Sequence, residues 1–313
     1  MMNVMIDPAA ELRQAFPEAL QEGALLARYT SARIGGPADY LLTARSATEL
    51  ESFASWLWER ELEFVVLGGG SNVLISDQGI RGVTILNHAR SLSFQEEGDN
   101  CTVHAESGAN LGAIARQAAQ QGYSGLEWAA GIPGTIGGAV VGNAGAHGGD
   151  MSVVILLADI LHHIKGRESW TVDDLKFEYR SSYLKSIPGH AMVLAAQMKL
   201  ERKPVEEIEA LMDSYLAHRR KTQPPGASMG SMFKNPPDDF AGRLIEVAGL
   251  KGKQIGQAQI SPLHGNFFLN LGDAKAADVR ELLRQAQSAV EEQFGIKLEP
   301  EIGMLGEWPD KPQ

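Results

Sequence analysis

The chain has 313 residues, enough for two domains at roughly 150 residues each. Apolar residues make up 44% and charged residues 21%, a balance that excludes a disordered or fibrous chain. The net charge of −11 argues against a protein that wraps nucleic acid or lies on an anionic membrane. It does not exclude a small anionic ligand, because a few placed cations and backbone N–H groups suffice to bind one.

Cys101 is the only cysteine, which excludes an intrachain disulfide framework and a cysteine-based metal cluster and favours a reducing cytoplasm. We expect no metal site. The first fourteen residues include Asp7 and Glu11 and lack a basic region followed by an apolar one, so we predict no signal peptide. Residues 128–146 are uncharged but contain six glycines, which predicts a glycine-rich loop region rather than a membrane span.

The first two hundred residues predict an α+β unit. Ser46 and Glu49 form a capping-box pattern that predicts a helix through about Arg60. A further helix is predicted at 111–121, closed by Gly122. Apolar and β-branched runs predict strands at 64–67, 83–86, 101–104, 153–164 and 192–200.

The composition changes near residue 203. Apolar residues at helical spacing predict a helix from Val205 to Lys221, which a Pro/Gly/Ser linker follows. Asp273 is expected to cap a second long helix that ends at Gly295. We therefore predict three segments, namely 22–89, 90–202 completed by 296–313, and a smaller domain over 203–295.

A predicted strand leads directly into a glycine-rich loop from Leu67 to Asp77. Glycines allow consecutive backbone N–H groups to converge on an anion, and Ser71 and Asn72 add side-chain donors. A tight turn between strands explains the same residues, and composition alone leaves both readings open. The loop is neither a P-loop nor a Rossmann fingerprint, because no Gly-Lys-Ser/Thr follows and Val73 stands where the third glycine belongs.

A second glycine-dense stretch extends from Gly131 to His147, and nine of the 25 residues in 125–149 are glycine. It offers few polar side chains, so it presents mainly backbone to a large, flat ligand. A glycine-rich packing corner is the alternative. Two such stretches in one domain favour a large cofactor over two unrelated turns.

Three short segments carry polar side chains suited to a ligand. Arg180 lies among aromatic residues and can bind a carboxylate through two parallel hydrogen bonds, although a surface salt bridge is the simpler role. Residues 230–236 combine a hydroxyl, an ammonium and an amide on one loop, where a solvated turn is the alternative. Glu299 and Glu301 flank a proline, and strand alternation would direct both to one face, although both can simply be exposed.

Taken in order, these segments resemble the UDP-N-acetylenolpyruvoylglucosamine reductase family, flavoenzymes of peptidoglycan precursor synthesis. The resemblance implies an α+β protein with a two-subdomain FAD-binding fold of the vanillyl-alcohol-oxidase/p-cresol-methylhydroxylase type and a smaller α+β substrate domain. It implies a cytoplasmic enzyme with noncovalent FAD, in which NADPH is the hydride donor. The implied reaction reduces UDP-N-acetylglucosamine enolpyruvate to UDP-N-acetylmuramate. The matching segments span nearly the whole chain: 29–38, 67–77, 131–149, 179–182, 230–236 and 298–306.

The resemblance also assigns roles by position. Arg180, Ser231 and Glu301 match the family's catalytic arginine, proton-donating serine and catalytic glutamate. The residues expected at the nucleotide sugar are Lys221, Lys234, Asn235 and His264. The residues expected at FAD are Leu67, Gly68, Gly69, Gly70, Ser71, Asn72, Ile132, Pro133, Gly134, Gly138, Val141, Gly142, Gly145 and Ala146.

The sequence departs from the family pattern at several positions. Gly303 stands where many members have arginine, His147 where tyrosine is common and Asp150 where glutamate is common. The short span between Tyr183 and Met192 is typical of a compact subtype without the loop that covers the substrate. Two alternatives stay open, an oxidase on the same flavin fold and a catalytically idle flavin- or nucleotide-binding module.

Overall fold

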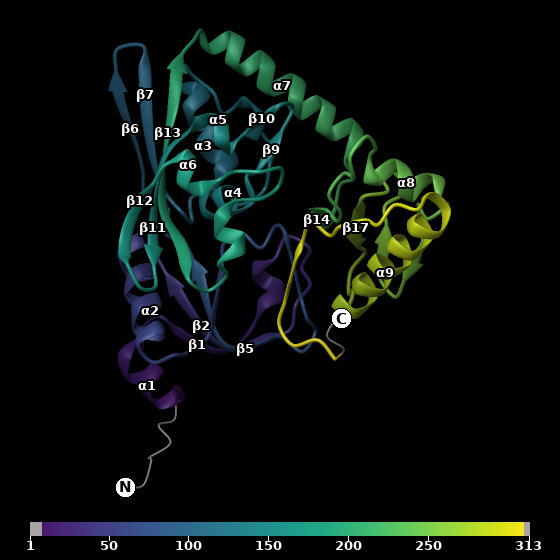
Figure 1. Ribbon diagram of the computed structural model, residues 1–313, viewed down its shortest axis with the longest axis horizontal. Coiled ribbons are helices and arrows are strands. Elements are labelled where there is room, and N and C mark those ends of the chain that lie inside the picture. Colours follow the sequence, from purple (N-terminus) through teal and green to yellow (C-terminus); the bar gives the residue numbers. More distant parts are fainter. Residues whose placement is uncertain (1–7, 310–313) are drawn as a thin grey trace, which may run out of the picture.

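A mixed four-stranded sheet forms the N-terminal region of the computed structural model, which describes residues 8–309 (Figure 1). Residues 1–7 and 310–313 lie outside the described residues. The prediction that the chain has no signal peptide depends partly on residues 1–7. The sheet has the order β1-β2-β5-β3, with β2 and β3 both parallel to β5. Its elements and those near it are α1 (Pro8–Ala15), β1 (Leu20–Leu25), η1 (Leu26–Tyr29), β2 (Pro37–Ala44), α2 (Ala47–Glu59), β3 (Phe64–Leu67), β4 (Val73–Ile75) and β5 (Ile80–Asn87).

Helix α2 begins as the sequence predicts. The Ser46 hydroxyl accepts a hydrogen bond from the Glu49 N–H at 3.1 Å, while the Glu49 carboxylate accepts one from the Arg45 N–H rather than from Ser46. One face of the helix buries apolar side chains such as Leu50 and Leu57 in the core above the sheet. Strand β3 spans the predicted residues 64–67, so the glycine-rich loop follows a real strand.

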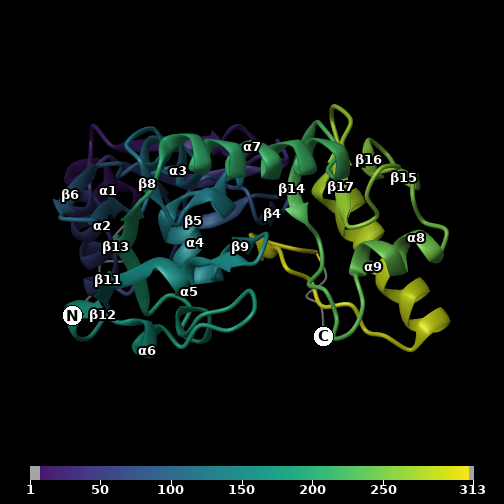
Figure 2. The same ribbon diagram turned by 90° about the horizontal axis from the view of Figure 1, so that it is seen from above.

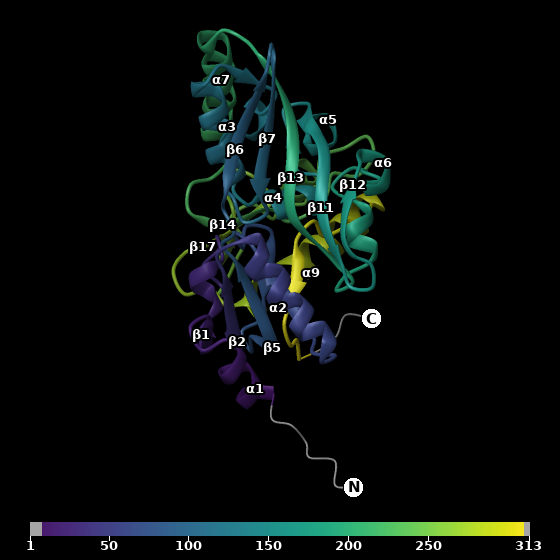
Figure 3. The same ribbon diagram turned by 90° about the vertical axis from the view of Figure 1, so that its left-hand side faces the viewer.

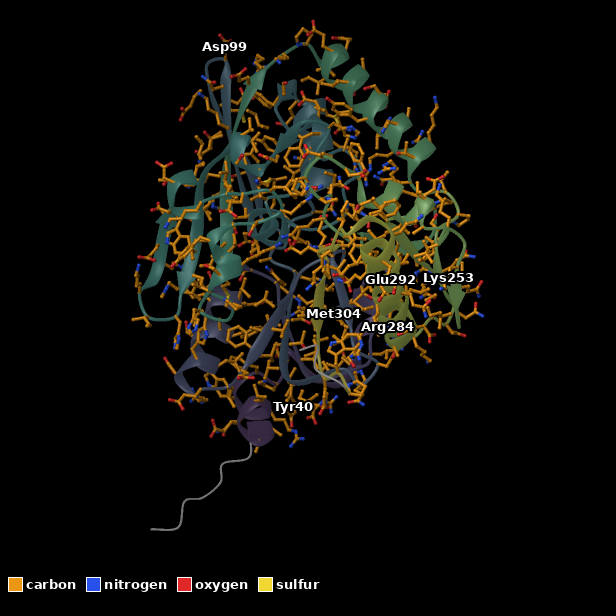
Figure 4. The ribbon with its side chains drawn as sticks, turned by 45° about the vertical axis from the view of Figure 1, so that its right-hand side comes forward. Tyr40, Asp99, Lys253, Arg284, Glu292 and Met304 are labelled. Carbon is orange, nitrogen blue, oxygen red and sulfur yellow. The ribbon has the colours of Figure 1, made fainter. Side chains whose placement is uncertain are left out.

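The second sheet is antiparallel, in the order β12-β11-β13-β7-β6, and adjoins the end of the first (Figure 3). Asp99, at the tip of the β6–β7 hairpin, and Tyr40 in β2 mark opposite ends of the molecule (Figure 4). The strands of this region are β6 (Leu92–Glu97), β7 (Asn100–Glu106), β8 (Tyr123–Ser124), β9 (Gly145–Ala146), β10 (Gly149–Asp150), β11 (Ile155–His162), β12 (Gly166–Trp170) and β13 (Ala191–Arg202). Strand β8 pairs with β13, whereas β9 and β10 form a separate two-stranded sheet. The helices of this region are α3 (Leu111–Gln120), η2 (Glu127–Ala129), α4 (Ile136–Gly142), α5 (Met151–Val154), α6 (Val172–Leu175) and η3 (Tyr183–Ser186).

The strand predicted at 153–164 begins later than expected. Val153 and Val154 belong to the short helix α5, because the Asp150 carboxylate accepts a hydrogen bond from the Ser152 N–H at 3.0 Å and caps a helical turn. The apolar run alone does not distinguish the last turn of a buried helix from a strand.

Helix α7 (Val205–Thr222) leads from β13 to a smaller C-terminal domain (Figures 1 and 2). Its four-stranded antiparallel sheet has the order β14-β17-β16-β15. Its elements are β14 (Ala227–Ser231), α8 (Ala241–Val247), β15 (Gln254–Ile255), β16 (Ala258–Ile260), β17 (Phe267–Asn270) and α9 (Ala276–Phe294). Within the described residues, no helix is long and apolar enough to cross a membrane.

The C-terminal domain shares its core with the N-terminal region. Ala32, Ile34 and Leu74 pack in the same buried cluster as the apolar face of α9. The chain then returns, and β18 (Gly303–Leu305) pairs in parallel with β4. This pairing joins β18 to residues 22–89, whereas residues 296–313 were predicted to complete the segment 90–202. The division into three segments otherwise stays a prediction.

Helix α9 is capped from a distance. Asp273 was expected to cap it, but the helix begins at Ala276 and no side chain adjacent in sequence caps it. Instead the Asp77 carboxylate, from the loop after β4, accepts hydrogen bonds from the N–H groups of Ala276 and Ala277 at 2.9 and 3.0 Å. A negative charge at a helix N-terminus also favours the helix dipole.

We expect the Asp77→Ala substitution to lower the free energy of unfolding by about 1–2 kcal/mol, because the cap also docks the C-terminal domain. Urea denaturation followed by circular dichroism measures the change. Asp273→Ala is the matched control and is expected to stay within about 0.5 kcal/mol of the unchanged protein. Equal losses in the two variants would contradict the distant cap.

Candidate active site

The two glycine-rich stretches predicted from the sequence lie against each other. The Ser71 hydroxyl donates a hydrogen bond to the Pro133 carbonyl at 3.2 Å. A Cβ atom added at Gly69 would lie 3.3 Å from the Gly134 Cα atom, and one at Gly68 would lie 2.5 Å from the Thr135 hydroxyl. The loop after β3 and the start of α4 therefore approach as closely as glycines allow and form one surface.

The loop after β3 leaves its backbone donors free. Within the described residues, the N–H groups of 69–72 have no hydrogen-bond partner. Gly70 adopts a φ of +57°, and a Cβ atom there would lie 2.1 Å from the Tyr29 carbonyl oxygen, so only glycine fits. Consecutive unpartnered N–H groups on a glycine turn form an anion-binding nest.

Helix α4 contains glycines that its own packing does not require. At Gly137 an added Cβ atom would lie 3.0 Å from the Ser107 side chain, so this residue is small for close packing. At Gly142 an added Cβ atom meets nothing within 4 Å, and at Gly138 it meets only the Thr135 hydroxyl, at 3.9 Å. Open space over helical glycines is a surface kept flat for a ligand, since glycine otherwise weakens a helix.

Arg180 occupies a tight turn. Glu178 and Ser181 exchange two backbone hydrogen bonds of 3.0 and 3.1 Å, which enclose Tyr179 and Arg180. Arg180 has a φ of +57°, a left-handed conformation that arginine rarely adopts. Its Nη1 atom donates to the Gly145 carbonyl at 2.8 Å, so the glycine-rich stretch fixes the guanidinium.

Glu301 lies where three parts of the chain meet. Its carboxylate oxygen Oε1 is 3.1 Å from Arg180 Nε, and the side chains are 15% and 27% exposed. Its N–H donates to the Met232 carbonyl, and its own carbonyl accepts a hydrogen bond from the Asn72 amide at 3.2 Å. The carboxylate is thus held between the loop after β3, the Arg180 turn and the end of β14.

Ser231 is the last residue of β14, directly before the Met232 carbonyl that Glu301 binds. Its side chain is half-buried, and its hydroxyl makes no hydrogen bond within the described residues. The structure therefore joins Arg180 to Glu301 through their side chains, and Glu301 to the residue after Ser231 through the backbone. It leaves the Ser231 hydroxyl available to a ligand.

A groove of about 850 Å³ borders this cluster. Its lining includes Tyr179, Lys234, Asn235, Phe240 and Glu299. Lys234 forms an ion pair with Glu299, and the Asn235 amide oxygen accepts a hydrogen bond from the Ala241 N–H at the start of α8. Two of the four residues expected at the nucleotide sugar thus share one groove.

The other two expected residues do not line this groove. Lys221 is exposed in the last turn of α7. His264 is half-buried beside α8, where its Nδ1 atom accepts a hydrogen bond from the Asn266 N–H at 3.1 Å. Burial and the nearby positive charge of Lys251 lower the pKa of His264. His264 is therefore uncharged at neutral pH, and it offers a ligand no positive charge there.

Sequence reasoning assigned no role to two further contacts. The Lys185 ammonium donates a hydrogen bond to the Arg180 carbonyl at 2.6 Å. His147, a departure from the family pattern, stacks on Tyr215 of α7 with ring centroids 4.1 Å apart. The sequence signals neither contact, because a backbone carbonyl acceptor leaves no trace in it, and His147 and Tyr215 are far apart along the chain.

Burial raises the pKa of Glu301, although Arg180, Lys185 and Lys234 lower it. At pH values between the ordinary pKa of a glutamate and the raised pKa of Glu301, the folded chain therefore binds more protons than the unfolded chain. The free energy of unfolding consequently falls as the pH rises through this range. We expect Glu301→Gln to remove this part of the pH dependence when urea denaturation of the apoprotein is compared at pH 4.5 and 7.5.

The Glu299→Gln variant is the control for this experiment, since it removes an exposed carboxylate two residues away. The amide in the Glu301→Gln variant does not titrate, so this position should contribute equally to the free energy of unfolding at both pH values. A Glu301→Gln variant with the pH dependence of the unchanged protein would contradict the raised pKa.

Two family models match the chain. Residues 38–161 match the FAD binding domain, and residues 221–305 match the C-terminal domain of UDP-N-acetylenolpyruvoylglucosamine reductase. The first match contains both glycine-rich stretches, and the second contains Ser231 and Glu301. The predicted α+β fold with an FAD-binding domain and a smaller C-terminal domain is confirmed.

Relatives match nearly the whole chain. UDP-N-acetylenolpyruvoylglucosamine reductase of Chloroflexus aggregans is 39% identical over 94% of this chain and 100% of its own. That of Bacillus velezensis is 41% identical over 95% and 97%. The solved structure of the Thermus caldophilus reductase superimposes with a TM-score of 0.77 and 37% identity, over 90% of this chain and 97% of its own. The chain belongs to the UDP-N-acetylenolpyruvoylglucosamine reductase family.

Proposed function

We propose that the protein uses FAD and NADPH to reduce the enolpyruvyl group of UDP-N-acetylglucosamine enolpyruvate, which yields UDP-N-acetylmuramate for peptidoglycan synthesis. The observation that carries this proposal is the meeting of Arg180, Glu301 and Ser231 at the edge of the two glycine-rich stretches. A catalytically idle binding module has no need for a strained arginine paired with a buried carboxylate. The reducing cytoplasm expected from the single cysteine suits a nucleotide-sugar substrate.

The chain's residues fit FAD. The unpartnered N–H groups of 69–72 suit the cofactor's pyrophosphate, and the open face of α4 at Gly138 and Gly142 suits a flat ring system. The remaining residues proposed here for FAD are Leu67, Gly68, Ile132, Pro133, Gly134, Val141, Gly145 and Ala146. FAD, once reduced by NADPH, supplies the hydride for the enolpyruvyl double bond. Cys101 is buried in the β-sheet core, so the chain has no thiol for a covalent flavin link.

Arg180 is proposed to stabilise the substrate's negative charge. Hydride addition at the terminal carbon of the double bond moves charge into the carboxylate as an enolate. The Arg180 Nη2 atom makes no hydrogen bond within the described residues, and a guanidinium group is protonated at every working pH. Preorganised donors aimed at developing charge supply a large part of enzymatic rate enhancement.

Ser231 is proposed to donate the proton that completes the reduction. Its hydroxyl is unpartnered and lies one residue from the carbonyl that holds Glu301. Serine is a weak acid in water, but an enolate is basic enough to take a positioned proton. Glu301, whose pKa burial raises, is proposed to hold the Arg180 side chain in place.

The substrate carries two phosphates and a carboxylate, so a chain of net charge −11 must bind it at a local cluster of positive charge. Lys234 and Asn235 are proposed to contact it in the groove. Lys221, at the end of α7, and His264, beside α8, are proposed as outer contacts with the nucleotide part.

We expect Gly138→Ala to lower the fraction of purified protein that carries FAD, because its Cβ atom would enter the open face of α4. The same change is expected to raise the free energy of unfolding of the apoprotein by about 0.4–1 kcal/mol, since alanine restricts the unfolded chain and favours a helix. Flavin absorbance and thermal unfolding measure the two effects. If the purified Gly138→Ala variant carries as much FAD as the unchanged protein and its apoprotein is stabilised, Gly138 does not contact the cofactor.

We expect Ser231→Ala to leave reduction of the flavin by NADPH nearly unchanged and to slow reoxidation by the UDP-enolpyruvyl sugar about 10²–10⁴-fold, the usual worth of a general acid. Ser231→Cys is expected to recover part of the loss. Anaerobic stopped-flow absorbance measures both half-reactions. Reoxidation of Ser231→Ala at the wild-type rate would show that the proton comes from elsewhere.

The same experiment on the unchanged protein tests the function itself. Bleaching by NADPH followed by recovery with the sugar belongs only to the proposed reductase. An oxidase recovers with oxygen but not with the sugar, and an idle binding module does not bleach.

A further inference from the structure

The turn that presents Arg180 is conformationally strained. Arg180 is the second central residue of a turn closed between Glu178 and Ser181, the position at which a type II turn favours glycine because φ is positive. A long side chain at a φ of +57° persists only where its surroundings determine it, and such residues cluster at active sites. Some contact must therefore hold this peptide.

Different contacts hold the two halves of Arg180. The Gly145 carbonyl accepts a hydrogen bond from the guanidinium Nη1 atom, and Glu301 forms an ion pair with the guanidinium at 3.1 Å from Nε, without hydrogen-bond geometry there. Lys185 is the residue that fixes the peptide, since its Nζ atom donates to the Arg180 carbonyl at 2.6 Å. That carbonyl belongs to the Arg180–Ser181 peptide, so the hydrogen bond restrains ψ of Arg180 and φ of Ser181, and with them the turn that places the guanidinium beside Glu301.

Lys185 is exposed, but its ammonium has a fixed partner. It stands in η3, five residues after Arg180, and forms no ion pair within the described residues. Partial burial of its ammonium and the positive charge of Lys234 lower its pKa, although Glu301 and Glu299 oppose this. The ammonium therefore binds a backbone carbonyl rather than a carboxylate, and a charged donor makes this hydrogen bond stronger than one between neutral groups.

We propose that Lys185 is a positioning residue for the reaction proposed above, where its ammonium fixes the left-handed turn from which Arg180 reaches Glu301 and the substrate carboxylate. This inference rests on the proposed function. It assigns to Lys185 no contact with the reacting atoms. Misplacement of a catalytic group by about 1 Å can cost about 10²-fold in rate, so the effect belongs in the chemical step more than in binding.

The test compares Lys185→Met, Lys185→Gln and Lys185→Arg with Lys176→Met. Lys176 is exposed, carries the same charge and lies near Tyr183, 5.2 Å above its ring, without contact to Arg180. We expect Lys185→Met to slow reoxidation by the UDP-enolpyruvyl sugar 10–100-fold, with reduction by NADPH unchanged and the substrate dissociation constant raised less than fivefold. Lys185→Arg, which keeps donor and charge, should recover most of the rate, and Lys176→Met should stay within twofold of the unchanged protein.

The pH profile gives a readout that a merely structural role would not move. The cations facing Glu301 are Arg180, Lys185 and Lys234, each of which lowers its pKa against burial. Removal of Lys185 is therefore expected to shift the Glu301 limb of the reoxidation profile to higher pH, in Lys185→Met and Lys185→Gln alike. Lys176→Met should leave this limb in place.

A crystal structure of Lys185→Met tests the inference independently of the reaction. A turn that keeps the positive φ at Arg180 and the Arg180–Glu301 ion pair would overturn it, as would reoxidation within twofold of Lys176→Met. If Lys185→Met does not fold, the crystal structure and kinetics of Lys185→Gln decide. If the unchanged protein is bleached by NADPH but not reoxidised by the sugar, the proposed function fails, whereas an unaffected Lys185→Met beside an active unchanged protein overturns only the role of Lys185.

Discussion

The parallel pairing of β18 with β4 is the constraint on which the site depends. It returns the end of the chain to the loop after β3, so that Gly303 donates to the Asn72 carbonyl and the Asn72 amide donates to the Glu301 carbonyl. From the other side the Glu301 N–H binds the Met232 carbonyl. One short segment therefore holds the glycine-rich loop after β3, the end of β14 and Glu301 in a single hydrogen-bonded frame.

The electrostatics of the site oppose those of the chain as a whole. A protein of net charge −11 gathers Arg180, Lys185 and Lys234 around the largely buried carboxylate of Glu301. Glu301 pairs with Arg180 and Glu299 pairs with Lys234, so within the described residues one of the three positive charges has no carboxylate partner. The raised pKa of Glu301 indicates that burial outweighs the combined attraction of these cations.

The sequence predicted the parts of this structure that depend on neighbours along the chain. Strand β3, the Ser46 cap and both glycine-rich stretches follow from local patterns of burial, capping and turn residues. Asp77 caps a helix 199 residues away, which no local pattern records, so Asp273 was the wrong choice. The resemblance to a family proposed Arg180, Ser231 and Glu301 as one site, but composition alone left each with an ordinary alternative.

Lys185 escaped prediction for a related reason. The partner of Lys185 is a backbone carbonyl, a group that every residue has. This carbonyl is important because Arg180, to which it belongs, has a strained positive φ. Sequence patterns indicate side-chain chemistry and hydrophobic periodicity, but they do not indicate which residue adopts an unfavourable backbone conformation. Positive φ at a long side chain becomes visible only in a structure, and from there the inference runs toward function.

The two ends of the site are fixed by different means, although Ser231 and Arg180 lie in distant parts of the chain. The shared core around Ala32 and Leu74, with the Asp77 cap, holds the C-terminal domain against the cofactor loop. On the α7 side, the His147–Tyr215 stack joins the second glycine-rich stretch to the helix that leads into that domain. Attachment at two places resists rotation about either one. Donors on such a frame need little reorganisation when charge develops on the substrate, which is the condition under which they stabilise it most.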